Sequence, residues 1–197
     1  MKPNIFLLLI DSLREDKFRK FCETHPNSNF KNLMENGIYF SQSISQADAT
    51  LLSLSSIFTG LFPFKTGIRS EKFNKMRSGV NTFFKNLKKS GYNFYGYYPT
   101  VVDLTNILPQ FQNDDSGKFS SPCITKDIDK KIVKLLDNLN SSWFVYLHCM
   151  DLHDPIHIPK KFDDKKIKTT YEKQIMAIDK SLGDIIKKID LEKTIFI

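Results

Sequence analysis

Apolar residues along this chain follow two spacings. Apolar runs predict strands at residues 4–10, 92–98, 143–149 and 194–197, and a weaker strand at 37–43. The continuous run at 4–10 is typical of a central parallel strand that is buried on both faces. Apolar residues that recur every three or four positions predict helices at residues 51–59, 81–90, 127–139 and 171–189. Strands that alternate with helices indicate a parallel sheet. We therefore expect one α/β domain over residues 1–197, a doubly wound and mostly parallel sheet with helices on both faces.

The composition supports a soluble globular domain. Apolar residues make up 41% of the 197 residues and charged residues 26%. The net charge of +7 can attract anionic partners, but the basic residues are mostly Lys and are spread along the chain. Such a spread is typical of a solvated surface, whereas nucleic-acid binding favours a clustered basic stripe. We expect no nucleic-acid partner, and the sequence leaves the oligomeric state open.

The cysteines and the N-terminus predict a cytoplasmic protein without a membrane span. Cys22, Cys123 and Cys149 are far apart in the sequence, which fits neither a disulfide framework nor a zinc motif. The apolar run of residues 5–10 is too short to cross a membrane, and charged residues follow it at once. This run has no small-residue cleavage site, so a signal peptide is not expected.

Asp11 is the first candidate for a functional residue, because it directly follows the first predicted strand. In doubly wound sheets, ligands bind beyond the carboxyl ends of the strands, where a carboxylate can hold a metal ion or a polar ligand. The alternative is structural, with Asp11 or Ser12 capping the turn that follows. The position alone does not choose between these roles.

Thr50 is the second candidate, at the start of a predicted helix. Free backbone N–H groups and the helix dipole favour an anion at this end, and they can stabilise an attacking oxyanion. The alternative is again helix capping, which a Thr in isolation favours.

The third candidate is the run HCMDLHDP at residues 148–155, which begins at the end of another predicted strand. It holds two His and two Asp within eight positions, which can bind a metal or move protons. The spacing matches no closed zinc motif. The alternative is a polar corner in which these side chains satisfy backbone groups.

Several segments, in the same order, resemble sulfatases of the alkaline phosphatase superfamily. PNIFLLLIDSLRED resembles the opening of the family, and ATLLSLSSIFTGLFPFKTGI resembles its nucleophile helix. The family places its nucleophile ten positions before the Gly of a Thr-Gly pair, and counting back from Gly60 gives Thr50. NTFFKNLKKSGYNFYGYY, WFVYLHCMDLHDPIHIP and YEKQIMAIDKSLGDII also resemble family segments. The resemblance covers nearly the whole chain and implies an alkaline phosphatase-like fold, truncated to its N-terminal part.

The resemblance implies a metal-dependent hydrolase of sulfate or phosphate esters. Thr50 would be the nucleophile, and Asp11 and Thr50 would bind a divalent ion (Ca, Mg, Mn or Zn). His153 would contact the substrate or protonate the leaving group. Lys65 is a further candidate for contact with a small anionic ester substrate.

Departures from the family pattern leave other functions open. Thr50, Leu52 and Leu54 stand where sulfatases have Cys or Ser, Pro and Arg, so formylglycine is not expected. A Thr nucleophile is instead typical of phosphoethanolamine and glycerol-phosphate transferases, which the sequence resembles at this position. The chain ends before the family's Thr/Ser-Asp-His-Gly, so the metal site is incomplete. A non-catalytic truncated remnant or an anion-binding module is therefore the alternative to an enzyme.

Overall fold

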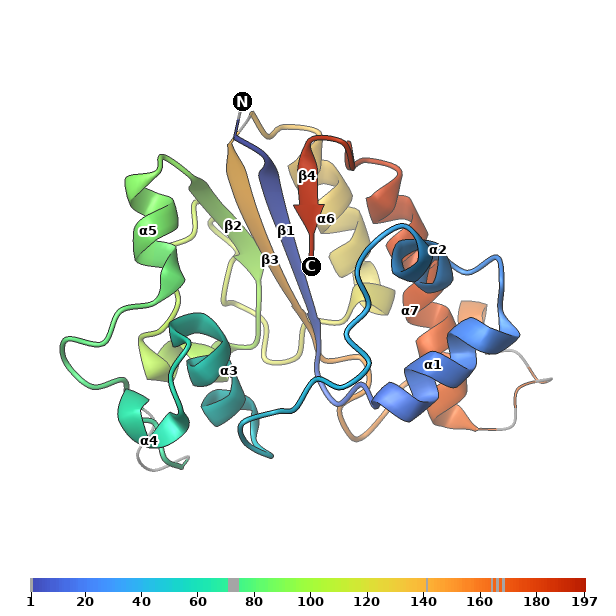
Figure 1. Cartoon of the computed structure of the whole chain (residues 1–197). Helices are drawn as coiled ribbons and strands as arrows, with labels where there is room; N and C mark the ends of the chain where they lie inside the picture. The colour runs from blue at the N-terminus through green and yellow to red at the C-terminus, as the bar shows by residue number, and fades with distance from the viewer. Residues whose placement is uncertain (1, 71–74, 141, 164, 166, 168) are drawn as a thin grey trace.

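A four-stranded parallel sheet forms the centre of the computed structural model (Figure 1), which describes residues 2–70, 75–140, 142–163, 165, 167 and 169–197. The strands are β1 (Asn4–Ile10), β2 (Asn93–Tyr97), β3 (Trp143–Cys149) and β4 (Thr194–Phe196). They lie in the order β2–β3–β1–β4, and each neighbouring pair is parallel. The carboxyl ends of β1 and β3 therefore lie side by side, with Ile10 opposite Cys149.

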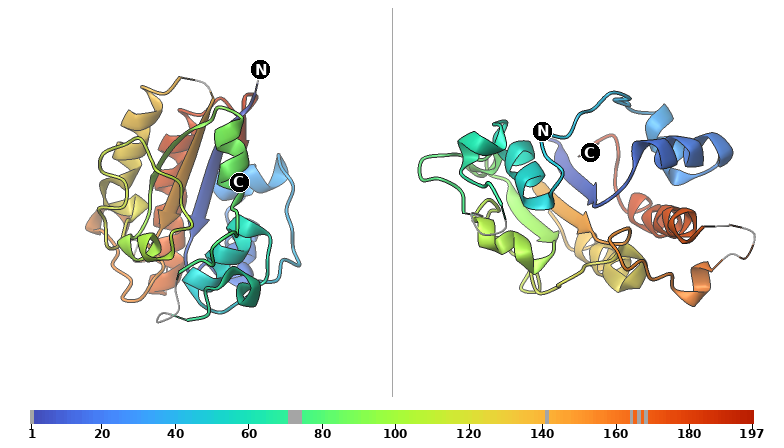
Figure 2. Two further views of the ribbon diagram at one scale, coloured as in Figure 1. Left: turned by 90° about the vertical axis from the view of Figure 1, so that its left-hand side faces the viewer. Right: turned by 90° about the horizontal axis from the view of Figure 1, so that it is seen from below.

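Helices cover both faces of this sheet, as Figure 2 shows from two further directions. On one face lie α1 (Glu15–Thr24), α2 (Asn29–Glu35), α6 (Asp129–Leu136) and α7 (Thr170–Ile186). On the other lie α3 (Thr50–Thr59), α4 (Pro63–Thr66) and α5 (Phe83–Lys89). Shorter helical turns occur at Thr100–Thr105, Ile124–Ile128 and Lys160–Phe162. The expectation of a doubly wound parallel sheet is confirmed.

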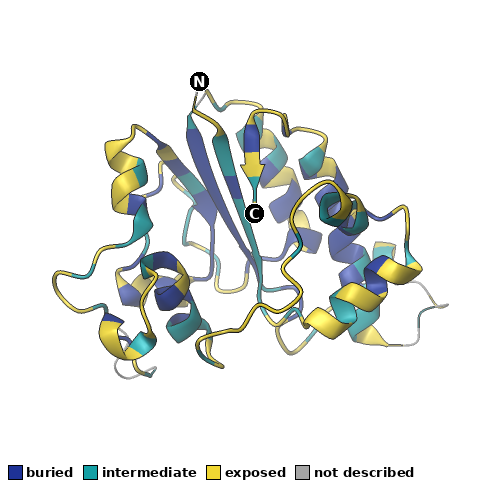
Figure 3. Cartoon of the chain, in the orientation of Figure 1, coloured by how far each residue is buried: buried dark blue, intermediate teal, exposed yellow. Residues whose placement is uncertain are grey.

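Two apolar clusters bury the two faces of the sheet, and both are dark blue in Figure 3. Phe6 of β1 packs in the cluster under α7, with Ile178 and Leu182. Phe58 of α3 packs in the other cluster, where its ring meets Tyr146 of β3 edge-on. Every residue of β3 is buried, which explains why this strand is a continuous apolar run in the sequence.

The strand predicted at residues 37–43 is wrong, because this segment is coil and turn between α2 and α3. Ile38 and Phe40, two apolar residues of the expected strand, are 84% and 72% exposed. No described strand pairs with the segment, and an unpaired strand leaves its backbone groups without a ladder.

The other predicted strands and helices are present, with ends that shift by a few residues. The predicted helix at 127–139 begins as α6 at Asp129, because Asp127 has a positive φ of 71° and breaks the helical backbone. The helices α1 and α2 lie where the sequence pattern predicted no element. None of the helices in the described residues is long and apolar enough to span a membrane.

Candidate active site

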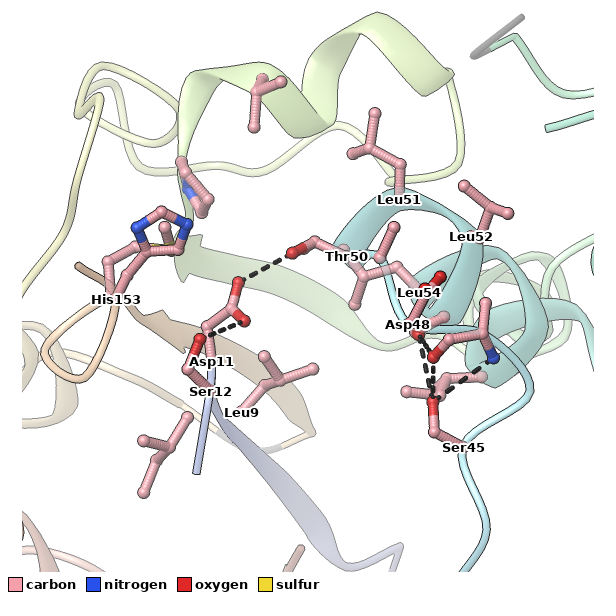
Figure 4. A pocket seen from close by; sticks show the side chains of 18 of the residues that line it. Leu9, Asp11, Ser12, Ser45, Asp48, Thr50, Leu51, Leu52, Leu54 and His153 are labelled. Carbon is pink, nitrogen blue, oxygen red and sulfur yellow. Dashed lines mark hydrogen bonds between the residues drawn. The ribbon is translucent and has the colours of Figure 1, made fainter. Parts of the chain in front are cut away.

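Asp11 and Thr50 meet at the carboxyl edge of the sheet. Asp11 is the first residue after β1, and Thr50 is the first residue of α3. The Oγ1 hydroxyl of Thr50 donates a hydrogen bond to Oδ2 of Asp11 over 3.0 Å (Figure 4). The two side chains, 39 positions apart in the sequence, are therefore close enough to contact one small ligand together.

Neither of these side chains caps a helix. The N-cap residue of α1 is Arg14, and that of α3 is Ala49, a residue whose side chain cannot cap. Thr50 directs its hydroxyl to a carboxylate instead of to the backbone of its own helix. The capping alternatives for Asp11 and Thr50 are therefore wrong, and both polar groups face each other.

The turn that carries Asp11 is fixed by contacts from two other elements. The backbone N–H of Asp11 donates to the carbonyl of Cys149 at the end of β3, over 2.9 Å. Ser12 has a left-handed backbone with φ of 62°, which turns the chain away from the strand. The hydroxyl of Tyr171 on α7 donates to the carbonyl of Ser12 and accepts from the N–H of Arg14. The Asp11 carboxylate thus stands on a rigid support.

A fully buried histidine also contacts Asp11. The ring of His148, on β3, places Nε2 at 3.3 Å from Oδ2 of Asp11 and Nδ1 at 3.0 Å from the hydroxyl of Tyr146. The sequence marked the run that begins at His148 but gave this residue no role of its own. The contact between His148 and Asp11 follows from the register of the sheet, in which Leu9 lies opposite His148. A single sequence does not reveal this pairing.

The Asp11 carboxylate is ionised at neutral pH. Its partial burial raises the pKa, but the hydrogen bonds from His148 and Thr50 are the main causes that lower it by more. The net result is a pKa below the ordinary value of 3.8. Asp11 is therefore a hydrogen-bond acceptor only, and it brings a negative charge to the edge of the sheet.

A cavity of about 870 Å³ opens at this edge, and Asp11, Thr50 and His153 all line it. Its size is in the range of small-molecule sites. Lys65 is exposed on α4 and is not among the lining residues. Arg69, which the sequence reasoning did not single out, lines the cavity instead, four positions further along the chain.

Asp151, the next carboxylate after β3, serves the scaffold. Its side chain is buried and accepts hydrogen bonds from the backbone N–H groups of Ile124 and Thr125. It also accepts from the Thr125 hydroxyl and the Gln174 amide. For Asp151, the alternative of a polar corner that satisfies backbone groups is confirmed.

The described residues alone do not complete a site for a divalent cation. They contain no group of three or more His, Cys, Asp and Glu side chains placed to hold a metal ion. Asp11 and Thr50 offer one carboxylate and one hydroxyl, whereas Ca²⁺ and Mg²⁺ take roughly six to eight oxygen ligands, some of them water. The pair fits part of such a site.

Solved structures with the same fold include several enzymes. The phosphonate monoester hydrolase of Agrobacterium radiobacter matches with a TM-score of 0.73 and 12% identity, over 99% of this chain and 61% of that one. A protein in the alkaline phosphatase superfamily from Vibrio parahaemolyticus matches with a TM-score of 0.65 and 17% identity, over 99% and 53%. The lipoteichoic acid synthase LtaP from Listeria monocytogenes matches with a TM-score of 0.61 and 15% identity, over 98% and 54%.

Because these identities are low, the matches show a shared fold and nothing more. The chain spans little more than half of the length of these proteins. No curated protein sequence matches it. The family model described as Sulfatase matches residues 3–197, which is almost the whole chain. The chain therefore belongs to the sulfatase family of the alkaline phosphatase superfamily.

Proposed function

We propose that this chain carries the nucleophile side of an active site that hydrolyses sulfate or phosphate esters, with Thr50 as the nucleophile. The observation that carries the proposal is the 3.0 Å hydrogen bond from Thr50 to Asp11 inside the cavity. A hydroxyl bonded to a carboxylate at a helix N-terminus is oriented for attack, and the free N–H groups of that terminus favour the anion it attacks.

The proposed reaction is an in-line displacement at sulfur or phosphorus. The Thr50 oxygen forms a bond to the central atom while the bond to the leaving alkoxide breaks, and the hydroxyl proton passes towards the Asp11 carboxylate. His153 lines the same cavity, which supports its proposed role as the group that gives a proton to the leaving group. Water then attacks the sulfur or phosphorus atom, and the bond to the Thr50 oxygen breaks. This step frees sulfate or phosphate and restores the Thr50 hydroxyl.

Two cationic side chains are proposed to attract the anionic ester. Arg69 lines the cavity, and its guanidinium keeps its charge at every physiological pH. Lys65 on α4 stays a proposed second contact, since its exposed side chain is long and mobile enough to reach towards a bulky substrate. Assays with sulfate and phosphate esters decide which of the two is the substrate.

A divalent cation is part of the proposal. Asp11 and Thr50 would supply two of its ligands, and water or further protein oxygens would complete its coordination. When bound, such an ion neutralises the anionic ester and lowers the pKa of a coordinated hydroxyl. Formylglycine has no place in this site, because residue 50 is Thr.

The test is turnover of 4-nitrophenyl sulfate, 4-nitrophenyl phosphate and bis(4-nitrophenyl) phosphate with Ca²⁺, Mg²⁺, Mn²⁺ or Zn²⁺. We expect hydrolysis of at least one ester, its loss in Thr50→Ala and its partial retention in Thr50→Ser. Thr59→Ala is the matched control, because Thr59 is at the other end of α3 and donates only to its own helix. Failure of the unmutated chain on every ester and metal contradicts the proposal and favours a non-catalytic remnant.

A second candidate is a transferase that passes a phosphoryl group to an alcohol. Thr50 favours it, because Thr is the nucleophile in the phosphoethanolamine and glycerol-phosphate transferases that the sequence resembles. The fold shared with LtaP is consistent with it. Adding glycerol to the phosphate diester reaction separates the two candidates: a transferase yields a glycerol ester, whereas a hydrolase yields only the phosphate monoester.

A further inference from the structure

We infer that His148 is a positioning residue that holds the Asp11 carboxylate in the orientation that accepts the Thr50 hydroxyl. This inference rests on the proposed function, because it assigns a role towards the proposed nucleophile. His148 itself does not line the cavity, so it acts through Asp11 and not on the substrate.

The position of the His148 ring is fixed by its strand and by its burial. His148 is 0% exposed, and it stands opposite Leu9 in the parallel pairing of β3 with β1. Tyr146, two residues earlier on the same face of the strand, is also 0% exposed and contacts Nδ1 of the ring. A buried imidazole between these partners has little freedom to rotate.

The partners of the ring also fix which nitrogen carries the proton. The atom of Asp11 that faces the ring is a carboxylate oxygen that also accepts from Thr50, so the His148 nitrogen nearest to it, Nε2, is the donor. In the neutral ring, Nδ1 is then the acceptor, and the Tyr146 hydroxyl donates to it. The result is a directed series of hydrogen bonds from Tyr146 through His148 to Asp11.

One oxygen of Asp11 receives both important donors. Oδ2 accepts from His148 Nε2 on β3 and from Thr50 Oγ1 on α3, whereas Oδ1 accepts from the neighbouring Ser12 hydroxyl over 3.5 Å. Without His148, the hydroxyl of Thr50 would be the main contact that sets the rotation of the carboxylate. Loss of this donor should therefore let the carboxylate turn away from the nucleophile.

Two substitutions of His148 separate positioning from a merely structural role. In His148→Gln, the amide nitrogen can reach Asp11 as Nε2 does, whereas His148→Leu fills a similar space without a donor. We expect kcat to fall roughly 10- to 100-fold in His148→Leu, the effect of losing a hydrogen bond to a charged group, with KM nearly unchanged. His148→Gln should recover most of this loss. Equal losses in both variants, or a change confined to KM, would overturn the inference.

A second measurement does not depend on turnover. Long-range ¹H–¹⁵N correlation spectra of the histidine rings report the tautomer, and the His148 signals are assigned by their absence in His148→Gln. We expect the Nε2–H form of His148 at neutral pH, and exposed His157 serves as the control. A proton on Nδ1, or exchange between both tautomers, contradicts the inferred series of hydrogen bonds.

A crystal structure of His148→Leu tests the role of His148 even if the chain is inactive. If the unmutated chain turns over no ester, the proposed function fails, but the inference about His148 is still decided. The inference expects the carboxylate of Asp11 to turn away from Thr50 in this variant. A retained contact between Asp11 Oδ2 and Thr50 Oγ1 would show that His148 does not position Asp11.

Discussion

At the scale of single residues, the partners of each aspartate distinguish the site from the scaffold. Asp11 accepts hydrogen bonds from the side chains of His148 and Thr50 and lines the cavity. Asp179 is buried under α2 and accepts a hydrogen bond from the backbone N–H of Phe30. A carboxylate bound by backbone groups anchors an element, whereas one bound by side chains beside a cavity is available for chemistry.

The buried Asp179 predicts a pH dependence of stability. Burial raises its pKa above 3.8 despite the hydrogen bonds from Phe30 and Asn29. Its contribution to the free energy of unfolding is therefore full below about pH 3.8 and is lost as the pH rises through the folded-state pKa. Asp179→Asn should remove this loss, so the free energy of unfolding should decline less between pH 4 and 7 than in the unmutated chain.

Urea unfolding at a series of pH values measures this difference in slope. Asp184→Asn is the control, since Asp184 is on the exposed side of the same helix and forms an ion pair with Lys187. This control should keep the pH dependence of the unmutated chain. The same slope in Asp179→Asn and the unmutated chain would contradict the assignment of a raised pKa.

Asp11 and Thr50 were expected as site residues from their positions after a strand and at a helix start and from the family resemblance. The structure brings their side chains together, and their roles stay predictions. The partnership of His148 with Asp11 was not predicted, because it arises from the pairing of β1 with β3. Arg69 was missed for a related reason, since which side chains enter the cavity depends on packing beyond the local sequence.

At the scale of elements, apolar runs gave correct strands wherever a partner strand exists. β1 and β3 match the predicted residues 4–10 and 143–149, and each lies between two other strands. Residues 37–43 have a weaker apolar pattern and no partner among the described strands. The helix α1 was not predicted, although Phe18, Phe21 and Cys22 have helical spacing, because it is short, charged and lacks a side-chain cap.

Gly96 lies where β2 packs closely against β3. A Cβ at this position would lie 2.4 Å from the backbone carbonyl oxygen of Tyr146, which cannot move without disturbing the sheet. Gly96→Ala should therefore lower the free energy of unfolding by about 3 kcal/mol or more, the upper range for overpacking. Chemical denaturation measures the loss.

Gly60→Ala is the comparison for the strand variant. Gly60 ends α3 with φ of 70°, and nothing lies within 4 Å of an added Cβ. Its cost should be that of the left-handed backbone alone, about 1–2 kcal/mol. A smaller loss in Gly96→Ala than in Gly60→Ala would show that β2 and β3 are not in close contact.

At the scale of the whole molecule, the sheet joins two apolar clusters into one structure. Phe6 belongs to the cluster under α7 and Phe58 to the cluster under α3, and both rings are fully buried. Tyr146 and Leu147, adjacent on β3, belong to different clusters, so the central strand connects them. The site lies at the edge of this shared sheet, where β1 and β3 end.

This arrangement predicts a single cooperative unfolding transition. Phe6→Ala and Phe58→Ala should each lower the free energy of unfolding by about 3–5 kcal/mol, as expected for a buried aromatic ring. Fluorescence of Trp143 and far-UV circular dichroism should report the same midpoint in each variant. Separate midpoints, with Trp143 insensitive to Phe58→Ala, would mean that the two faces of the sheet unfold independently.

The central claim is that the Thr50 oxygen, held by Asp11, attacks the ester. The most direct measurement is mass spectrometry of peptides from a reaction stopped with acid during turnover, with Thr50→Ala as the control. We expect a sulfuryl or phosphoryl group on Thr50 in the unmutated chain and none at this position in the variant. Turnover that persists in Thr50→Ala, or a modification found on another residue, would contradict it.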